Sequence, residues 1–173
     1  HLYASRKLRQ SVYVRIKVGD KEVFVPDFYL DQDIEQPSVI HSPIIGWSYD
    51  GSPIYGPYGY SDNSGGSIKI LESGYSASIS SIRPNPLTAT GEQIYSEGLF
   101  VEDYNYDGGG DLDKHNGRFC KTPEYPNGVY AYFSLINPTI NDDDGSFKNY
   151  RKPQFPYFIG NSYKYQPIDY NFD

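Results

Sequence analysis

Residues 111–134 read DLDKHNGRFCKTPEYPNGVYAYFS, and this stretch decides the fold. Its Asn116-Gly117 pair suits a positive φ and predicts a tight turn, which residues 118–121 follow as a short run. A second turn at residues 126–128 leads into residues 129–133, whose aromatic side chains between loop formers are typical of a packed strand. We therefore predict strand, loop and strand here, with no helix.

The composition predicts one domain with an aromatic core. A chain of 173 residues can bury a substantial core, and 19 tyrosines and 9 phenylalanines supply large side chains for it. The 17 glycines and 13 prolines mark many turns and leave little room for helices. The net charge of −7 and the pI of about 4.9 argue against a nucleic-acid partner, because phosphate binding needs a basic field.

Three further features limit the class of protein. The single cysteine, Cys120, cannot form an intrachain disulfide, so we predict a small packed hydrophobic side chain there. No apolar run approaches the roughly eighteen residues of a membrane helix, so no membrane span is expected. Methionine is absent even at the start, so we expect a processed product or a slice of a longer polypeptide.

The pattern along the chain divides it into three parts. Apolar residues alternate with polar ones over residues 11–28, with Gly19-Asp20 as a two-residue turn, which predicts a β-hairpin ended by Pro26. We take residues 1–38 as this hairpin and a connector, residues 39–165 as the main β domain, and residues 166–173 as a C-terminal tail. From Tyr163 onward the tail looks suited to packing on something else.

Within the main domain we predict strands at residues 41–50, 67–71 and 155–160, and a buried run at residues 99–101. Residues 51–60 alternate turn formers with bulky residues, which predicts an ordered loop that places Ile54, Tyr55 and Tyr58 on the core. Loops are expected at residues 62–66 and 141–145, and a surface excursion at residues 73–90. The fold class is therefore mainly β, an antiparallel sandwich or irregular barrel with long ordered loops, preceded by the hairpin.

An acidic loop is a candidate calcium site. Asp103, Asn105 and Asp107, followed by a glycine, fit the first half of a calcium-loop pattern, whose alternate oxygens surround a hard cation. The second half fails, since Lys114 stands where a bidentate glutamate is required, although Asp111 or Asp113 could substitute. The simpler interpretation is a solvated acidic loop, so Ca²⁺ is a possible ligand and no other cofactor is expected.

Two other kinds of site have weaker support. Asp111, Asp113 and His115 at alternate positions could present three ligands to a transition metal, but the chain has few further imidazoles, and structural hydrogen bonding is the simpler interpretation. His41 precedes Ser42, and acids are plentiful, yet no G-x-S-x-G elbow occurs and glycosidase-like carboxylate pairs cannot be placed. We expect no enzymatic activity.

Four ordered blocks of sequence resemble the YHYH domain family. They are HSPIIGWSYDGSPIYGPYGY at residues 41–60, DLDKHNGRFC at residues 111–120, GVYAYF at residues 128–133 and FPYFIG at residues 155–160. In the namesake form, the resemblance places histidines where this chain has Ala131 and Phe133, and another where it has Arg118. Of the imidazoles that could have bound a metal, only His41 and a displaced His115 remain.

This histidine-poor form is similar to the version found in large virion proteins of tailed bacteriophages, notably those that infect marine cyanobacteria. The resemblance implies a module of a tail or baseplate protein, located in the extracellular particle and assembled with other virion subunits as a homo-oligomer or hetero-oligomer. Exposed tyrosines tend to anchor interfaces and fit such a role, although about two thirds of the 19 tyrosines should simply fill the core.

We therefore expect a structural role, with polar side chains around the Asn116-Gly117 corner bracing an aromatic scaffold. Asp111 and Asp113 are expected to pair with Arg118 or to cap loop amides. The alternative function is an extracellular module that binds surface glycan or Ca²⁺ in host adhesion, and a degenerate enzyme comes third. The residues expected to carry the scaffold are His41, Trp47, Asp50, Tyr55, Asp111, Asp113, His115, Asn116, Arg118 and Tyr132.

Overall fold

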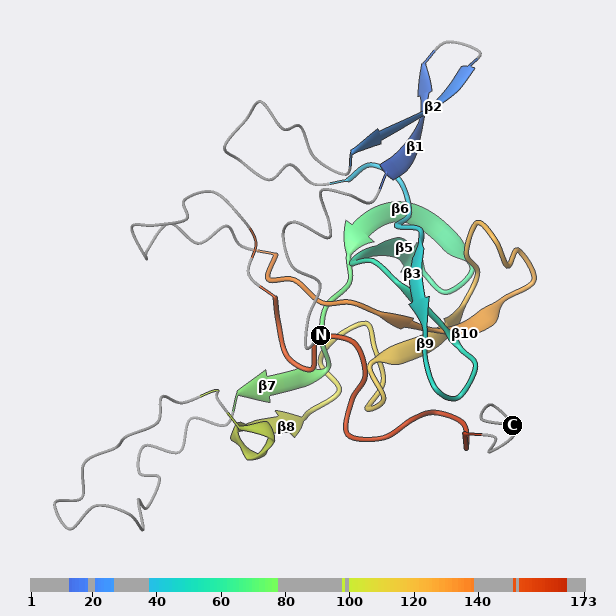
Figure 1. The fold of residues 1–173 in the computed structure, drawn as a ribbon. Helices are drawn as coiled ribbons and strands as arrows, with labels where there is room; N and C mark the ends of the chain where they lie inside the picture. The colour runs from blue at the N-terminus through green and yellow to red at the C-terminus, as the bar shows by residue number, and fades with distance from the viewer. Residues whose placement is uncertain are drawn as a thin grey trace, which may run out of the picture.

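The computed structural model describes residues 13–18, 21–26, 38–77, 98, 100–138, 151 and 153–167. As predicted, the described chain is mainly β, with several small sheets and a single turn of 3₁₀ helix, η1 (Val101–Asp103) (Figure 1). Its described strands do not close into a barrel, and a sandwich-like arrangement is compatible with them. The described residues contain no helix of the length and hydrophobicity needed to cross a membrane.

A four-stranded sheet carries the central stretch of sequence. Its strands are β3 (Ile44–Trp47), β4 (Pro53–Tyr55), β10 (Val129–Phe133) and β9 (Gly117–Cys120), in that order across the sheet. The β3–β4 and β10–β9 pairs are antiparallel, but β4 and β10 are parallel. The sheet is therefore mixed, whereas the other described strand pairs are antiparallel, as expected. Parallel pairing is possible because a long stretch of chain separates β4 from β10 and can cross over between them.

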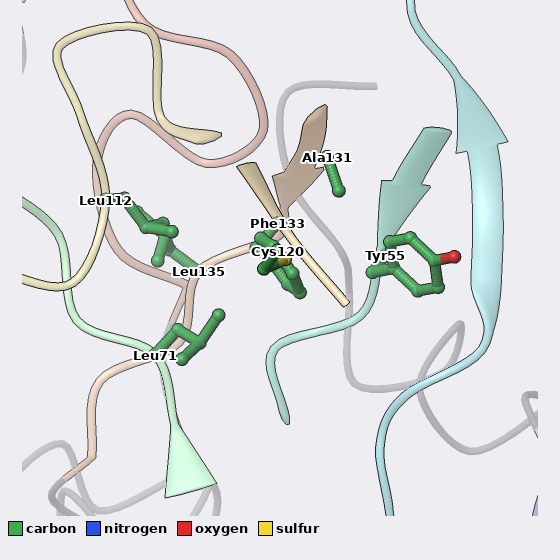
Figure 2. Close-up of a cluster of buried hydrophobic side chains, with 7 residues drawn as sticks. All are labelled: Tyr55, Leu71, Leu112, Cys120, Ala131, Phe133 and Leu135. Atoms are coloured by element: carbon green, nitrogen blue, oxygen red, sulfur yellow. The ribbon is translucent and has the colours of Figure 1, made fainter. Parts of the chain in front are cut away.

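The two faces of this sheet differ in what they bury. Side chains alternate along β10, so Ala131 and Phe133 point to one face, which we call the inner face, and Tyr130 and Tyr132 to the other, the outer face. The inner face carries a core cluster whose members are all buried (Figure 2): Tyr55, Leu71, Leu112, Cys120, Ala131, Phe133 and Leu135. The core is thus partly aromatic, and Cys120 is a packed hydrophobic residue, as predicted.

Three hairpins or strand pairs accompany the sheet. The predicted N-terminal hairpin is present as β1 (Tyr13–Val18) and β2 (Lys21–Pro26), and residues 19–20 lie between its two strands. A second hairpin joins β5 (Tyr58–Asp62) to β6 (Gly65–Ile70). The third pair is β7 (Tyr75–Ala77) with β8 (Tyr104–Tyr106), which brings together segments nearly thirty positions apart.

The predicted corner between residues 113 and 118 forms as a tight turn. Asn116 has a φ of 66°, and its N–H donates to the carbonyl of Asp113. A Cβ on the next residue, Gly117, would lie 2.5 Å from the hydroxyl of Tyr130 and 2.7 Å from the carbonyl of Ala131, so only glycine fits there. The Asn-Gly pair is therefore required both by the backbone conformation and by close packing on β10.

Several sequence-based boundaries were wrong. Residues 51–60, expected as a loop, contain β4 and the start of β5, although Tyr55 and Tyr58 are buried as predicted. The expected buried run at residues 99–101 is exposed where it is described, with Phe100 at 39% and Val101 at 51%. The physical reason is that this short run begins η1, and its Phe100 N–H is held by the Asp103 carboxylate rather than by a sheet.

Residues 155–160, expected as a final strand, form a turn. Tyr157 has a φ of 74°, and the Phe158 N–H donates to the Pro156 carbonyl at 2.9 Å, so the backbone cannot run extended through this point. Apolar side chains here pack as a loop instead of as a strand. The expected acidic loop at residues 141–145, most of the surface excursion at residues 73–90, and residues 168–173 lie outside the described residues.

Candidate functional site

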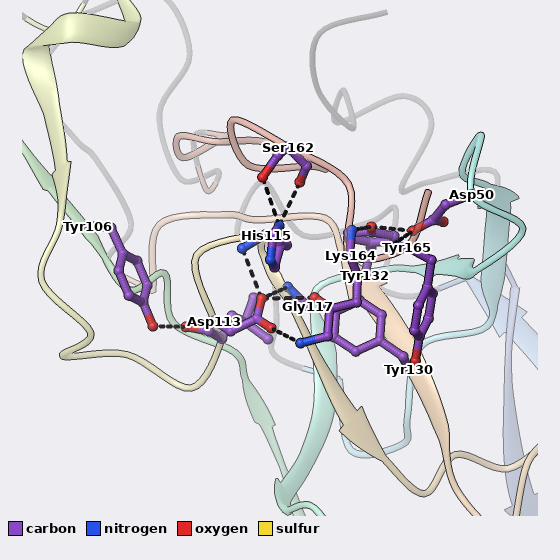
Figure 3. Close-up of polar contacts among 11 residues, drawn as sticks. Asp50, Tyr106, Asp113, His115, Gly117, Tyr130, Tyr132, Ser162, Lys164 and Tyr165 are labelled. Atoms are coloured by element: carbon purple, nitrogen blue, oxygen red, sulfur yellow. Dashed lines mark hydrogen bonds and ion pairs between the residues drawn. The ribbon is translucent and has the colours of Figure 1, made fainter. Parts of the chain in front are cut away.

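The outer face carries a site built on two aspartates. Asp113 is the first, at the start of the Asn-Gly corner (Figure 3). Its Oδ1 accepts the N–H of His115 at 2.9 Å, the N–H of Gly117 at 3.3 Å and the hydroxyl of Tyr130 at 2.8 Å. Its Oδ2 lies 3.4 Å from the ammonium of Lys164. The carboxylate therefore caps the loop amides of its own turn, as predicted, and ties the turn to β10.

Asp50 is the second aspartate, in the turn that follows β3. Its Oδ1 accepts the hydroxyl of Ser48 and, at 3.1 Å, the N–H of Ser52. Its Oδ2 accepts the hydroxyl of Tyr132 at 2.7 Å and the N–H of Tyr165 at 3.1 Å. Burial raises the pKa of the Asp50 carboxyl, but the four hydrogen bonds outweigh burial and hold its pKa below the usual value.

Two tyrosines of β10 connect these aspartates. The Tyr132 hydroxyl donates to Asp50 and accepts the backbone N–H of Lys164 at 2.7 Å, and the rings of Tyr130 and Tyr132 meet edge to face at 5.3 Å. Both phenols are nearly or fully buried. Burial above all raises their pKa values, and the neighbouring carboxylates raise them further, so both hydroxyls remain protonated donors.

The same site holds a C-terminal segment, residues 158–165, which we call the strap. Asn116 donates from Nδ2 to the carbonyls of Phe133 and Phe158, both at 2.9 Å, so it links β10 to the beginning of the strap. His115 accepts the N–H of Gly160 on its carbonyl at 2.9 Å, and its Nδ1 donates to the carbonyl of Ser162 at 3.0 Å (Figure 3). The tail that we expected to pack on something else is, up to residue 165, packed on its own domain.

Asp111 lies apart from this site. Its carboxylate pairs with the ammonium of Lys69 on β6 at 2.9 Å and accepts the N–H of Glu72 at 2.8 Å. Asp111 and Asp113, expected to pair with Arg118 or to cap loop amides, form no ion pair with Arg118, and both accept backbone N–H groups. The reason is strand alternation: Arg118 pairs with Ala131 in register and points to the inner face, away from the Asp113 corner.

The inner face holds a second polar group. Arg118 is 7% exposed; its Nη2 donates to the carbonyl of Tyr60 at 2.5 Å, and its guanidinium carbon lies 5.6 Å from the centre of the Phe133 ring. His41, also 7% exposed, contacts the rings of Tyr55, Tyr60 and Phe133 at centroid distances of 5.1, 5.0 and 6.0 Å. Burial lowers the pKa of His41.

The remaining predicted site residues are placed as follows. Tyr55 is fully buried, and its hydroxyl contacts Thr122 at 2.8 Å and donates to Glu124 at 3.0 Å. Burial raises the pKa of Tyr55. Trp47, named as part of the scaffold, is 58% exposed at the end of β3 and takes no part in the core cluster.

The four residues named for Ca²⁺ do not gather around one point. Asp103 accepts the N–H of Phe100 at 3.0 Å, Asp107 accepts the N–H of Gly109 at 2.8 Å, and Asn105 is exposed on β8. Asp111 is held by β6, as described above. Among the residues that the structure describes, no three His, Cys, Asp or Glu side chains could together hold a metal ion. Calcium binding stays a prediction.

Sequence reasoning missed several residues of the outer-face site. Tyr130 belongs to the predicted strand but was not named, and strand alternation with Tyr132 was the signal that could have found it. Ser48 and Ser52 flank Asp50 at a spacing typical of side chains that cap a turn. Lys164 carried no local signal, because it reaches the site only through the folded strap.

Comparison with known proteins identifies one family. The sequence profile described as YHYH protein matches residues 26–143, more than half of the chain. No curated protein and no solved structure matches the chain.

The positions at which the resemblance places histidines lie together on the inner face. Ala131 pairs with Arg118 across β10 and β9, Arg118 lies over the ring of Phe133, and His41 contacts the same ring. In this chain these positions supply a methyl group, a guanidinium and a phenyl ring beside one imidazole. The cluster therefore packs as core, with Ala131 and Phe133 fully buried.

Proposed function

The chain belongs to the YHYH protein family, and we propose that it serves as a non-catalytic structural module of a bacteriophage tail or baseplate protein, holding other virion subunits through protein–protein contacts. Two exposed aromatic side chains on the end strands of the sheet carry this proposal. Trp47 on β3 is 58% exposed and Phe119 on β9 is 61% exposed. Large aromatic side chains held on rigid strands are the usual anchors of protein interfaces.

The hydrogen bonding of the outer face supports the non-catalytic half of the proposal. Each carboxylate oxygen of Asp50 accepts two hydrogen bonds from the chain itself, and Oδ1 of Asp113 accepts three. A general acid or base needs a carboxyl group that can exchange a proton with a substrate. These carboxylates are instead committed to bracing β10, the Asn-Gly corner and the strap.

The virion assignment rests on the resemblance to the histidine-poor form of the family. It is tested by cross-linking mass spectrometry of intact particles of the phage that encodes the chain. We expect cross-links from lysines of this chain, including Lys69, Lys114 and Lys164, to other tail or baseplate proteins. Complete absence of the chain from purified particles would contradict the assignment.

Substitution of the two exposed anchors tests the contact surfaces directly. Trp47→Ser and Phe119→Ser should each reduce co-assembly of the full-length protein with its tail partners by at least about tenfold, the size of a modest interface anchor. Val39→Ser is the matched control, because Val39 is 78% exposed but is not aromatic. If all three variants have the same thermal midpoint and assemble equally well, Trp47 and Phe119 do not anchor the contacts with tail partners.

Glycan binding is the second candidate, and one observation favours it. Tyr49 and Tyr163 are 36% and 39% exposed, their rings lie 6.1 Å apart, and Tyr165 is 50% exposed on the same strap. Exposed tyrosine rings can stack on pyranose sugars. Titration with oligosaccharides released from the host surface, followed by the fluorescence of Trp47, distinguishes the two functions, because only the glycan candidate predicts a saturable change.

A further inference from the structure

Arg118 is a buried cation that lacks a carboxylate partner among the described residues. Its side chain is 7% exposed, and its bonding comprises the Tyr60 carbonyl, the face of the Phe133 ring and the thiol of Cys120. Its Nε has no hydrogen-bond partner in the described chain. Burying a charge is costly unless an opposite charge or several hydrogen bonds compensate. The guanidinium therefore has one donor without a partner, and no carboxylate among the described residues neutralises its charge.

His41 also has a buried ring nitrogen without a hydrogen-bond partner in the described chain. Its Nδ1 lies 2.7 Å from the carbonyl oxygen of Ser42, which can only accept, so Nδ1 carries a hydrogen. Its Nε2 is buried and has no hydrogen-bond partner in the described chain. The imidazole is 7% exposed and is enclosed by the rings of Tyr55, Tyr60 and Phe133.

These two nitrogens belong to the same corner of the inner face. Arg118 and His41 both contact the ring of Phe133, at 5.6 and 6.0 Å from its centre, and both contact Tyr60, one through its carbonyl and one through its ring. We propose that this corner is a binding site for one small inorganic anion, of the size of chloride, held between Arg118 Nε and His41 Nε2. The proposal goes beyond the structural role and does not depend on it.

The aromatic side chains around His41 and Arg118 limit the size of the anion. The rings of Tyr55 and Tyr60 lie against His41, the ring of Phe133 lies against the Arg118 guanidinium, and the two nitrogen atoms themselves are buried from solvent. A monatomic anion needs little more room than a water molecule, whereas a large organic anion would have to displace the rings. One water molecule is the competing occupant, since it could accept from Arg118 Nε and donate to His41 Nε2.

The anion and the water differ in how they depend on pH. A neutral His41 directs a lone pair from Nε2, which repels an anion, so anion binding requires His41 to take up a proton. Burial lowers the pKa of His41 and nearby Arg118 acts in the same direction, while the Ser42 carbonyl and Glu124 raise it. Burial raises the pKa of Tyr55, whose ring also contacts His41, so its hydroxyl stays protonated and adds no charge beside the imidazole. Anion affinity should therefore rise as the pH falls.

Thermal unfolding of the chain in potassium chloride and in potassium gluconate at equal ionic strength tests the site. At chloride concentrations ten times Kd, the thermal midpoint should rise by about 3–6 °C relative to gluconate, with a larger rise at about pH 5.5 than at about pH 8. The rise should be lost in Arg118→Lys, which keeps the charge but removes the Nε–H donor. It should also be lost in His41→Phe, which keeps an aromatic ring but removes both ring nitrogens. Arg151→Lys, at another buried arginine, should retain it.

Three outcomes would overturn the proposal. Equal midpoints in chloride and gluconate would assign the corner to water. A chloride effect that survives both Arg118→Lys and His41→Phe would place the anion elsewhere. If either variant fails to fold, crystals of the unsubstituted chain soaked in bromide decide the matter: an anomalous peak between Arg118 and His41 supports the site, and a corner without one contradicts it.

Discussion

The two faces of the four-stranded sheet hold the side chains of the same strand, β10, by different interactions. On the inner face, Phe133 of β10 stacks on Tyr55 at 5.6 Å and is held by packing. On the outer face, the adjacent Tyr132 is equally buried but is held by hydrogen bonds to Asp50 and to the strap. One residue of offset therefore separates a site of apolar packing from a site of buried hydrogen bonds. The faces should respond differently to the loss of a side chain and to acid.

The largest effect is expected on the inner face. Phe133→Ala removes a fully buried ring that contacts Tyr55, His41 and Arg118, so it should lower the free energy of unfolding by about 3–5 kcal/mol. Chemical denaturation followed by Trp47 fluorescence measures this. Phe119→Ala, at an exposed ring, is the control and should cost well under half as much. Similar losses for both would mean that the inner face is not the stabilising core.

Asp113→Ala is expected to be the most damaging change on the outer face. It leaves the Tyr130 hydroxyl and the Gly117 N–H without their acceptor, and should cost about 2–3 kcal/mol. The thermal midpoint checks this value. Asp113→Asn, which keeps one acceptor oxygen, should recover part of the loss. An unchanged midpoint in the alanine variant would show that the corner does not brace the domain.

Tyr132→Phe is the direct counterpart of the Phe133 substitution. It keeps the ring but removes the hydroxyl that joins Asp50 to the strap, and should cost about 1–2 kcal/mol. A double-mutant cycle with Asp50→Asn should show a coupling of about 1 kcal/mol, because the two side chains share one hydrogen bond. Additive effects would contradict the proposed coupling across the outer face.

Acid should destabilise the outer face through Asp50. Because the folded pKa of Asp50 lies below its unfolded value, near 3.8, its stabilising contribution is complete above that value and is lost as the pH falls through the folded pKa. Asp50→Asn should therefore be less stable at neutral pH but less sensitive to pH below about 4. Unfolding curves measured across the acid range give the change of unfolding free energy with pH for the unsubstituted protein and for Asp50→Asn. Parallel slopes for the two proteins would be the contrary result.

The smallest effect is expected from calcium. Because Asp103, Asp107 and Asp111 are engaged by different parts of the chain, removal of Ca²⁺ with a chelator should leave the thermal midpoint within about 1 °C. Calorimetric titration with Ca²⁺, before and after chelation, provides the check. A midpoint that rises by many degrees on adding the ion would instead favour the calcium-binding alternative and would add a third stabilising element beside the two faces.

Local features of this chain could be predicted because their causes are local. The Asn116-Gly117 corner, the strand at residues 129–133 and the N-terminal hairpin follow from turn chemistry and alternation, and all three are present. The other expectations failed because composition does not reveal how a segment meets its neighbours. The glycines and prolines of residues 51–60 do not prevent β4 from pairing with β3 and β10. The apolar residues 100 and 101 are exposed at η1, and residues 155–160 form a turn rather than a strand.

The sequence by itself determined a mainly β, tyrosine-rich domain with a turn at one Asn-Gly corner, because short-range periodicity and the preference of glycine and asparagine for positive φ act within a few residues. Only the tertiary structure decided that β4 and β10 pair in parallel, that Arg118 points away from Asp113, and that Lys164 reaches Asp113 from the strap. Those contacts join residues tens of positions apart, and their geometry depends on how the sheet places its two faces.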